Sequence, residues 1–348
     1  MAEAHMTPDG WRRDKQDGHA RRASWHDYRS PAIYLLTLSV VDRKPLLGRL
    51  IGETIDRSPL GQQISEEIER IPTYKDASSI EIYSYIVMPD HIHILMRVHD
   101  RLPKHLGSYL GWFKLQCADR YNGRPFGTPA PGCSVLGDVP PSSQPLFAPE
   151  YHDRLLTHRG QLANMAHYIQ DNPRRLAIKR ANPDLFRIHQ QTPIAGVACT
   201  TLGNMFLNDN PLKAALHCSR TLTQAEINVL QDECLDKAAS GTIFVSAAIA
   251  EGEKQICRAL REAGYPLIIL LCEGFPSPDS PHYKYYKPQG VYFEACAAGK
   301  LLLIEPSDEL FERPEIEAKV YAKTGPIPHN TKRYRFVSLN AFAEEIAG

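Results

Sequence analysis

The first half of the chain alternates apolar and polar residues in a way that predicts an antiparallel sheet. Three segments have this pattern: AIYLLTLSVVDR (32–43), SIEIYSYIVM (79–88) and HIHILMRVH (91–99). A period of two places successive side chains on opposite faces of a strand. The second and third segments meet at Pro89-Asp90, a dipeptide that favours a tight turn, so we expect a hairpin there.

Apolar residues at helical spacing predict three helices in the same half, over 59–71, 102–122 and 158–172. We expect the last helix to end at Pro173, which lacks a backbone donor. One strand, a helix, a hairpin and two helices predict a compact α+β domain, in which a small antiparallel sheet has its helices packed on one face.

Two segments of this half show neither pattern. Residues 1–30 are polar and poor in aliphatic side chains, which predicts a disordered arm. Residues 123–150 are rich in proline, glycine and serine, which predicts a loop or an insertion.

The second half alternates short apolar runs with helical stretches. The expected strands cover 212–219, 242–248, 266–273 and 300–306. The expected helices cover 223–239, 251–264, 287–297 and 338–347. Such alternation predicts an α/β domain with a parallel, Rossmann-like sheet. We therefore expect the arm over 1–30 to precede two domains, over 31–190 and 191–348.

Composition agrees with an ordinary globular protein of two domains. The 348 residues exceed what one hydrophobic core usually serves, and 43% hydrophobic and 23% charged residues are typical values. No apolar run approaches the roughly 18 to 20 residues that span a bilayer, and no secretion signal is evident. We therefore expect a cytoplasmic, nucleoid-associated protein with no membrane partner. The eight cysteines include no CxxC pair, which favours reduced core thiols over disulfides or a zinc cluster.

The formal net charge of zero conceals an uneven distribution. Residues 101–190 carry 12 Lys and Arg against 6 Asp and Glu, whereas residues 191–348 carry 15 against 19. A basic region of this size permits nucleic-acid binding but does not by itself indicate it.

Two histidines one residue apart interrupt the apolar strand over 91–99. His91, His93, Leu95 and Arg97 share one face of that strand, while Ile92, Ile94, Met96 and Val98 share the other. Both imidazoles then point the same way, at a spacing that lets them bind one metal ion. Two hydrogen-bonded or surface histidines explain an isolated His-x-His equally simply.

A second polar pair lies on the helix over 158–172. Tyr168 and Asn172 are four residues apart, so they stack on one side of that helix, at the edge of its apolar stripe. An edge tyrosine can pack its ring and still present its hydroxyl. The basic residues that follow are either a solvated helix end or phosphate contacts. They are Arg174, Arg175, Lys179 and Arg180.

Three segments, taken in order, resemble the single-tyrosine HUH transposases, in particular the REP-associated tyrosine transposases. They are YIVMPDHIHILMRV, YHDRLL and HYIQDNPRRLA. The resemblance covers about residues 30–185. It implies a ferredoxin-like or RRM-like fold and cleavage of single-stranded or hairpin DNA. By position, His91 and His93 match the metal-binding histidines, Tyr168 the nucleophile and Asn172 the polar residue that completes the metal site. Asp90 departs from the family, whose members commonly have Asn there.

The resemblance implies a transesterification. A divalent ion would stabilise the phosphodiester transition state while Tyr168 attacks, giving a 5′-phosphotyrosine and a free 3′-OH that can later be rejoined. Two imidazoles and an amide oxygen suit Mg²⁺ or Mn²⁺, although zinc stays open. His167 points away from Tyr168 on the helix, so no general base is assigned.

Other polar residues have less defined roles. Arg97 and the basic residues after Asn172 are expected DNA contacts. Asp153 and Arg154 in YHDRLL belong either to the functional motif or to a structural ion pair that fixes the tyrosine helix, and we favour the ion pair. In the second half, the turn SAAIAEGE (246–253) precedes a helix whose N-terminus could bind phosphate, and this region is loosely similar to the Rossmann-like domain of the DprA family.

Two other functions fit the same residues. A hydrolytic metal phosphoesterase would use the histidines to activate water and Tyr168 only structurally. A non-catalytic protein would use a basic groove of the first domain and the Rossmann-like half to hold single-stranded DNA. The sequence leaves open a monomer or a homodimer.

Overall fold

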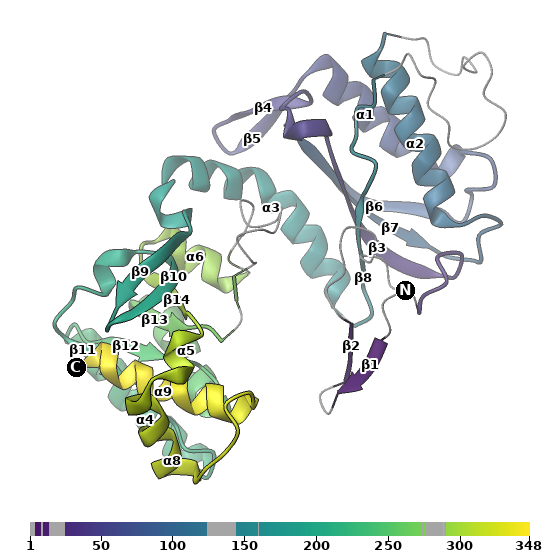
Figure 1. The fold of residues 1–348 in the computed structure, drawn as a ribbon. Coiled ribbons are helices and arrows are strands. Elements are labelled where there is room, and N and C mark those ends of the chain that lie inside the picture. The colour runs from purple at the N-terminus through teal and green to yellow at the C-terminus, as the bar shows by residue number, and fades with distance from the viewer. Residues whose placement is uncertain are drawn as a thin grey trace. The chain divides into compact units, whose positions relative to one another are not determined.

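The computed structural model describes residues 4–7, 10–13, 25–123, 144–158, 160–272, 274–275, 288 and 290–348. It divides the chain into two compact units, Met1–Ala177 and Ile178–Gly348 (Figure 1). The boundary between the units falls inside one long helix, α3 (Gln161–Ala181). The structure is therefore mixed α and β, and each unit has its own sheet.

The sheet of the first unit is antiparallel throughout, with the strand order β6-β7-β3-β8 (Figure 1). Its strands are β3 (Ala32–Ser39), β6 (Ile80–Met88), β7 (His91–Val98) and β8 (His152–Leu155). The three predicted strands and the hairpin at Pro89-Asp90 are confirmed. Strand β8 was not predicted, because only Leu155 in it is aliphatic.

Two helices cover one face of this sheet: α1 (Pro59–Arg70) and α2 (Leu106–Tyr121). Ile64 of α1 and Leu110 of α2 are fully buried in one core with Ile92 and Ile94 of β7. Ser58 begins α1 by accepting the amide hydrogen of Gly61, as a serine N-cap does. The aliphatic face of β7 is thus buried against helices, as predicted.

The third helix, α3, packs on the opposite face. Ile169 of α3 is fully buried together with Leu35 of β3 and Leu95 of β7. The prediction that all helices share one face is therefore wrong. Leu35 and Leu95 give the face that carries the histidines an apolar patch, and α3 covers it.

Helix α3 also continues through Pro173, where we expected it to end. Proline has no N–H to donate to the carbonyl four residues earlier, which here is that of Ile169. The side-chain amide of Asn172 donates to that carbonyl instead, at 3.3 Å. The helix therefore tolerates the proline because a neighbouring side chain replaces the missing donor.

Parts of the two segments expected to be irregular belong to the fold. Within residues 1–30 the structure describes an antiparallel pair, β1 (Ala4–Thr7) and β2 (Gly10–Arg13), and the chain from Trp25. Tyr28 is buried and stacks on Tyr34 with ring centroids 5.8 Å apart, so the end of the expected arm joins the core. The rest of that arm, and residues 124–143 of the expected insertion, lie outside the described residues.

The remaining described part of the expected insertion also packs. Leu146 and Phe147 are buried, and Phe147 bridges to Val40 at the end of β3. A separate hairpin, β4 (Gly48–Ile51) with β5 (Thr54–Arg57), lies between β3 and α1 in the sequence.

The sheet of the second unit has the strand order β11-β12-β13-β14-β10-β9 (Figure 1). Four strands are parallel: β11 (Lys213–Ala215), β12 (Ile243–Ser246), β13 (Leu267–Leu270) and β14 (Leu301–Pro306). They confirm the four predicted strands and their parallel pairing. β10 (Val197–Gly203) and β9 (His189–Ile194) pair antiparallel at one edge and were not predicted, because β9 is polar and contains Pro193.

Helices cover both faces of this second sheet. One face carries α4 (Gln224–Ala239), α5 (Glu251–Glu262) and α6 (Val291–Ala297). The other carries α7 (Glu309–Glu312), α8 (Pro314–Thr324) and α9 (Lys332–Ala347). The prediction missed α7 and α8 and began α9 six residues late. None of the described helices is both long and apolar enough to cross a membrane.

Candidate metal and nucleophile site

Strand β7 holds His91 and His93 at the edge of the apolar patch that α3 covers. Their ring centroids lie 4.8 Å apart, with the ring planes 86° to each other. Their relative exposures are 6% and 7%. Two imidazoles this close, on one face of a strand and almost out of solvent, have the arrangement that a shared ligand requires.

A neighbouring group engages the Nδ1 atom of each imidazole. Thr37 Oγ1 on β3 lies 2.8 Å from His93 Nδ1, because Thr37 is directly opposite His93 in the sheet. Asp90 Oδ1 lies 2.6 Å from His91 Nδ1. Metal-binding histidines usually have such a partner on the second nitrogen, which fixes the ring orientation. Nε2 is then the nitrogen that each ring would present to a metal ion.

The sequence suggested only a turn role for Asp90, but in the structure Asp90 also contacts His91. Burial acts to raise the pKa of Asp90, but the hydrogen bond and charge of His91, together with Arg43, hold that pKa below its usual value. Arg43 Nε lies 3.4 Å from Asp90 Oδ2. A charged carboxylate on Nδ1 makes the imidazole of His91 a better electron donor than a neutral amide there would.

Helix α3 brings Tyr168 to the histidine pair. The centroids of the Tyr168 and His93 rings are 6.2 Å apart, with an interplanar angle of 62°. Tyr168 is half-buried, in contact with the apolar cluster that contains Leu35, Leu95 and Ile169. The same packing that buries Ile169 therefore fixes the tyrosine ring beside the strand that carries the imidazoles.

Asn172, one helical turn after Tyr168, is 3% exposed. Its Nδ2 donates to the carbonyl of Tyr168 at 3.0 Å and to that of Ile169 at 3.3 Å. With its amide hydrogens committed to the helix backbone, Asn172 presents Oδ1 as its acceptor. An oxygen ligand is what the resemblance assigns to this position.

His91, His93 and Asn172 offer two imidazole nitrogens and one amide oxygen as possible ligands of a divalent cation. Two imidazoles and an amide oxygen form a mixed set suited to Mn²⁺ or Mg²⁺. Among the described residues, no cluster of three or more His, Cys, Asp or Glu side chains could hold a metal ion. The candidate site differs from such clusters because its third ligand would be an amide.

Two arginines influence the Tyr168 hydroxyl. Burial raises the pKa of Tyr168, and the charges of Arg175 and Arg154 act to lower it. The guanidinium carbon of Arg175 lies 5.7 Å from the centre of the Tyr168 ring. Both cations would stabilise the phenolate, or a phosphate placed beside it.

The sequence favoured a structural ion pair over a role in this site for Arg154. Arg154 and Asp153 are neighbours on β8, so they lie on opposite faces of the sheet. Arg154 is paired with Leu35, on the face covered by α3, whereas Asp153 accepts a hydrogen bond from Tyr28 at 2.6 Å on the other face. The expected ion pair between them is therefore wrong. In a strand, the alternation of HDRL places the Asp153 and Arg154 side chains on opposite faces, which excludes an ion pair between them.

The predicted DNA-contact residues are scattered. Arg175 is 8% exposed and packs on Tyr168, so it is not part of a solvated helix end. Arg174 pairs with Asp171 at 2.6 Å. Arg97 is exposed, but at about 3.3 Å per residue it lies about 20 Å along β7 from His91.

The two remaining predicted contacts belong to the second unit. Lys179 lies 5.6 Å from the centre of the Phe186 ring, and Arg180 is exposed. Of the three predicted contacts in the first unit, Arg175 is the one that lies beside Tyr168.

No family model matches the chain. An uncharacterized protein of Haemophilus influenzae is 24% identical over 81 residues, which are 23% of this chain and 44% of that protein. The chain thus spans less than half the length of this curated relative.

Three solved structures show a loose, partial likeness. A REP-associated tyrosine transposase bound to a REP hairpin has a TM-score of 0.32 and 15% identity, over 46% of this chain and 74% of that chain. A putative transposase from Deinococcus radiodurans has a TM-score of 0.24 and 19% identity, over 42% of this chain and 94% of that chain. DNA processing protein A from Helicobacter pylori has a TM-score of 0.25 and 21% identity, over 34% of this chain and 54% of that chain. Its structure is described with its single-stranded DNA binding mode. The chemistry of the candidate site rests on its own geometry.

Proposed function

We propose that this protein cleaves and rejoins single-stranded or hairpin DNA through a covalent bond to Tyr168, with Mg²⁺ or Mn²⁺ as cofactor. The observation that carries the proposal is the 6.2 Å separation of the Tyr168 and His93 rings across the contact between α3 and β7. A phosphate group bound there would lie between the phenol and a cation held by the imidazoles. The strand order of the first unit also supports the ferredoxin-like fold that the sequence resemblance implies.

The residues have distinct roles in this reaction. His91, His93 and Asn172 would hold the cation, which when bound neutralises charge on the non-bridging phosphate oxygens. Tyr168 Oη forms a bond to phosphorus while the bond from phosphorus to the 3′ oxygen breaks. The phenol loses a proton and the departing 3′ oxygen gains one, so the exchange is balanced. Arg175 and Arg154 stabilise the negative charge that develops on the phenol oxygen.

The covalent product retains the energy of the phosphodiester bond. A 3′-OH can therefore attack the phosphotyrosine and restore a DNA strand without another energy source. This property distinguishes strand transfer from hydrolysis, in which water ends the reaction.

Adduct trapping tests the proposal. The full chain is incubated with a labelled hairpin carrying a single-stranded flank and Mn²⁺, then denatured and separated by electrophoresis. We expect a labelled, denaturation-resistant protein band that is lost in Tyr168→Phe. The matched control is Tyr83→Phe, because Tyr83 is 48% exposed on β6. This control should retain the band.

The alternatives give different results in the same experiment. Cleavage without a covalent band, and unaffected by Tyr168→Phe, would indicate a hydrolytic phosphoesterase. Hairpin binding without cleavage in Mg²⁺, Mn²⁺ or Zn²⁺, and unaffected by His91→Ala, would indicate a DNA-binding protein without catalytic activity. Either result would overturn the proposal.

A further inference from the structure

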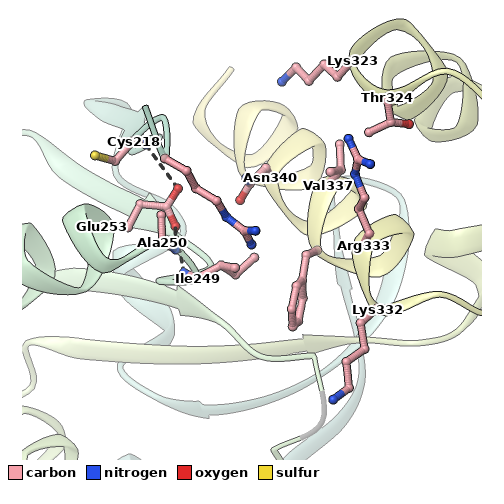
Figure 2. Close-up of a pocket in the computed structure, with 12 residues that line it drawn as sticks. Cys218, Ile249, Ala250, Glu253, Lys323, Thr324, Lys332, Arg333, Val337 and Asn340 are labelled. Carbon is pink, nitrogen blue, oxygen red and sulfur yellow. Dashed lines mark hydrogen bonds between the residues drawn. The ribbon is translucent and has the colours of Figure 1, made fainter. Parts of the chain in front are cut away.

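A cavity of about 580 Å³ opens in the second unit, and Figure 2 shows residues that line it. Its lining includes Cys218, which follows β11, and Ile249, which follows β12, so it lies beyond the carboxyl ends of these strands. This end of a parallel sheet is where loops commonly form ligand sites, and the volume suits a small molecule. Cations come from three separate parts of the chain around it. They are Arg220 after β11, Lys323 at the end of α8, and Lys332 and Arg333 at the start of α9.

The floor of the cavity already contains an anion. Glu253 is 2% exposed, and its carboxylate accepts the amide hydrogens of Cys218, Ile249 and Ala250 at 3.2, 2.8 and 3.1 Å (Figure 2). Ile249 and Ala250 lie just before α5, and Cys218 follows β11, so this carboxylate occupies three amide donors around the turn. Phosphate binding by the SAAIAEGE turn itself stays a prediction. The cationic side chains around the cavity attract an anionic ligand away from the Glu253 carboxylate.

The first turn of α9 contains cations and no acidic residue. Helix N-termini carry a partial positive charge and favour acidic residues in the first turn. The first turn of α9 contains no acidic residue and begins with Lys332 and Arg333, after the Thr331 cap. The helix dipole disfavours two cations at this end, so their placement lowers local stability. Residues that lower local stability in this way are characteristic of functional sites. A bound anion would offset the repulsion.

The next turns of α9 line the same cavity with groups suited to a nucleobase. Phe336 is half-buried there, and Asn340 follows one turn later. Asn340 Oδ1 is buried and has no hydrogen-bond partner among the described residues. Figure 2 shows Asn340 projecting from α9 toward the cavity. An amide oxygen accepts hydrogen bonds from the exocyclic amino group of a base, and a phenyl ring stacks on its face.

We propose that this cavity binds a free nucleoside phosphate whose base carries an exocyclic amino group. The proposal goes beyond the DNA chemistry at Tyr168 and does not depend on it. Arg220, Lys332 and Arg333 bind the phosphates, while Phe336 and Asn340 bind the base. The lining of this one cavity contains a single aromatic residue, whereas surfaces that track a DNA strand use a series of them.

Isothermal titration calorimetry on the full chain tests the proposal with four probes: ATP, UTP, inorganic phosphate and an oligothymidine of eight nucleotides. We expect ATP to bind at least about tenfold tighter than inorganic phosphate and tighter than UTP, which lacks the amino group. Arg220→Ala and Arg333→Ala should each weaken ATP binding about tenfold or more. Asn340→Ala should remove the preference for ATP over UTP.

Two controls keep the result specific. Arg258→Ala removes an exposed arginine of α5 that does not line the cavity, so it should leave ATP affinity unchanged. Tyr168→Phe should also leave it unchanged, which separates this site from the proposed DNA chemistry. The proposal is overturned if ATP binds no tighter than phosphate, if Arg258→Ala matches Arg333→Ala, or if only the oligonucleotide binds in an Arg333-dependent way.

Discussion

The side-chain amide of Asn172 donates to the carbonyl of Ile169, the group that Pro173 leaves without its normal helical partner. Asn172 thus repairs the backbone of α3 and, in the proposed site, presents its oxygen to the metal ion. We expect Asn172→Ala to lower the free energy of unfolding by about 1 to 3 kcal/mol, because a buried carbonyl loses its donor. The same change should weaken Mn²⁺ binding.

A double-mutant cycle separates these two effects. Pro173→Ala returns an N–H to the helix, so Asn172→Ala should cost less stability in that background than in the parent chain. Its effect on Mn²⁺ affinity should be the same in both backgrounds. Urea denaturation and Mn²⁺ titration provide the two readouts. Equal stability losses in both backgrounds would show that Asn172 does not compensate for the proline.

The partners of the imidazole Nδ1 atoms give a second prediction. Thr37→Val and Asp90→Ala should each reduce Mn²⁺ affinity by about 10- to 100-fold, since they leave His93 and His91 without a group that fixes ring orientation. Asp90→Asn should have a smaller effect, because an amide oxygen still reaches Nδ1. Calorimetric Mn²⁺ titration measures all three variants. Unchanged affinity in Thr37→Val and Asp90→Ala would argue against a metal on this pair.

Arg154 and Asp153 provide a matched pair on β8. Arg154→Ala should slow formation of the Tyr168 adduct by about tenfold or more and hardly change stability, because the exposed Arg154 acts only by its charge. Asp153→Ala should instead destabilise the fold by about 1 to 3 kcal/mol, because the hydroxyl of buried Tyr28 loses its acceptor. Single-turnover adduct assays and urea denaturation compare the two. Equal effects of both variants on the rate would refute a specific role for Arg154.

Regular periodicity made much of the fold predictable. The strands β3, β6 and β7 combine alternating positions with short apolar runs, and β12, β13 and β14 are short, mostly apolar segments, so their burial follows from composition. Strands β8 and β9 show neither alternating apolar positions nor an aliphatic run. Their pairing depends on neighbouring strands and was visible only in three dimensions.

In the candidate site too, local periodicity was predictable from the sequence, whereas tertiary contacts were not. The spacings of His91 with His93 and of Tyr168 with Asn172 placed each pair on one side of its element, which local geometry alone decides. Their approach to each other depends on Ile169, Leu35 and Leu95, which dock α3 on the sheet. The sequence could not reveal that docking, and it favoured the wrong face for α3. Arg154 was missed because adjacent opposite charges suggest an ion pair, whereas a strand directs them apart.

Buried thiols in the second unit predict a loss of stability at alkaline pH. Burial raises the pKa of Cys234 to about 11 and of Cys257 and Cys296 to about 12. In the unfolded chain these thiols ionise near their ordinary pKa of about 8.5. Their contribution to stability is therefore complete below that pH and is lost progressively up to about pH 12. Urea denaturation under reducing conditions at pH 8 and pH 10 should show a lower free energy of unfolding at pH 10. Cys296→Ala should reduce that difference, and an unchanged difference would mean that this thiol ionises equally in both states.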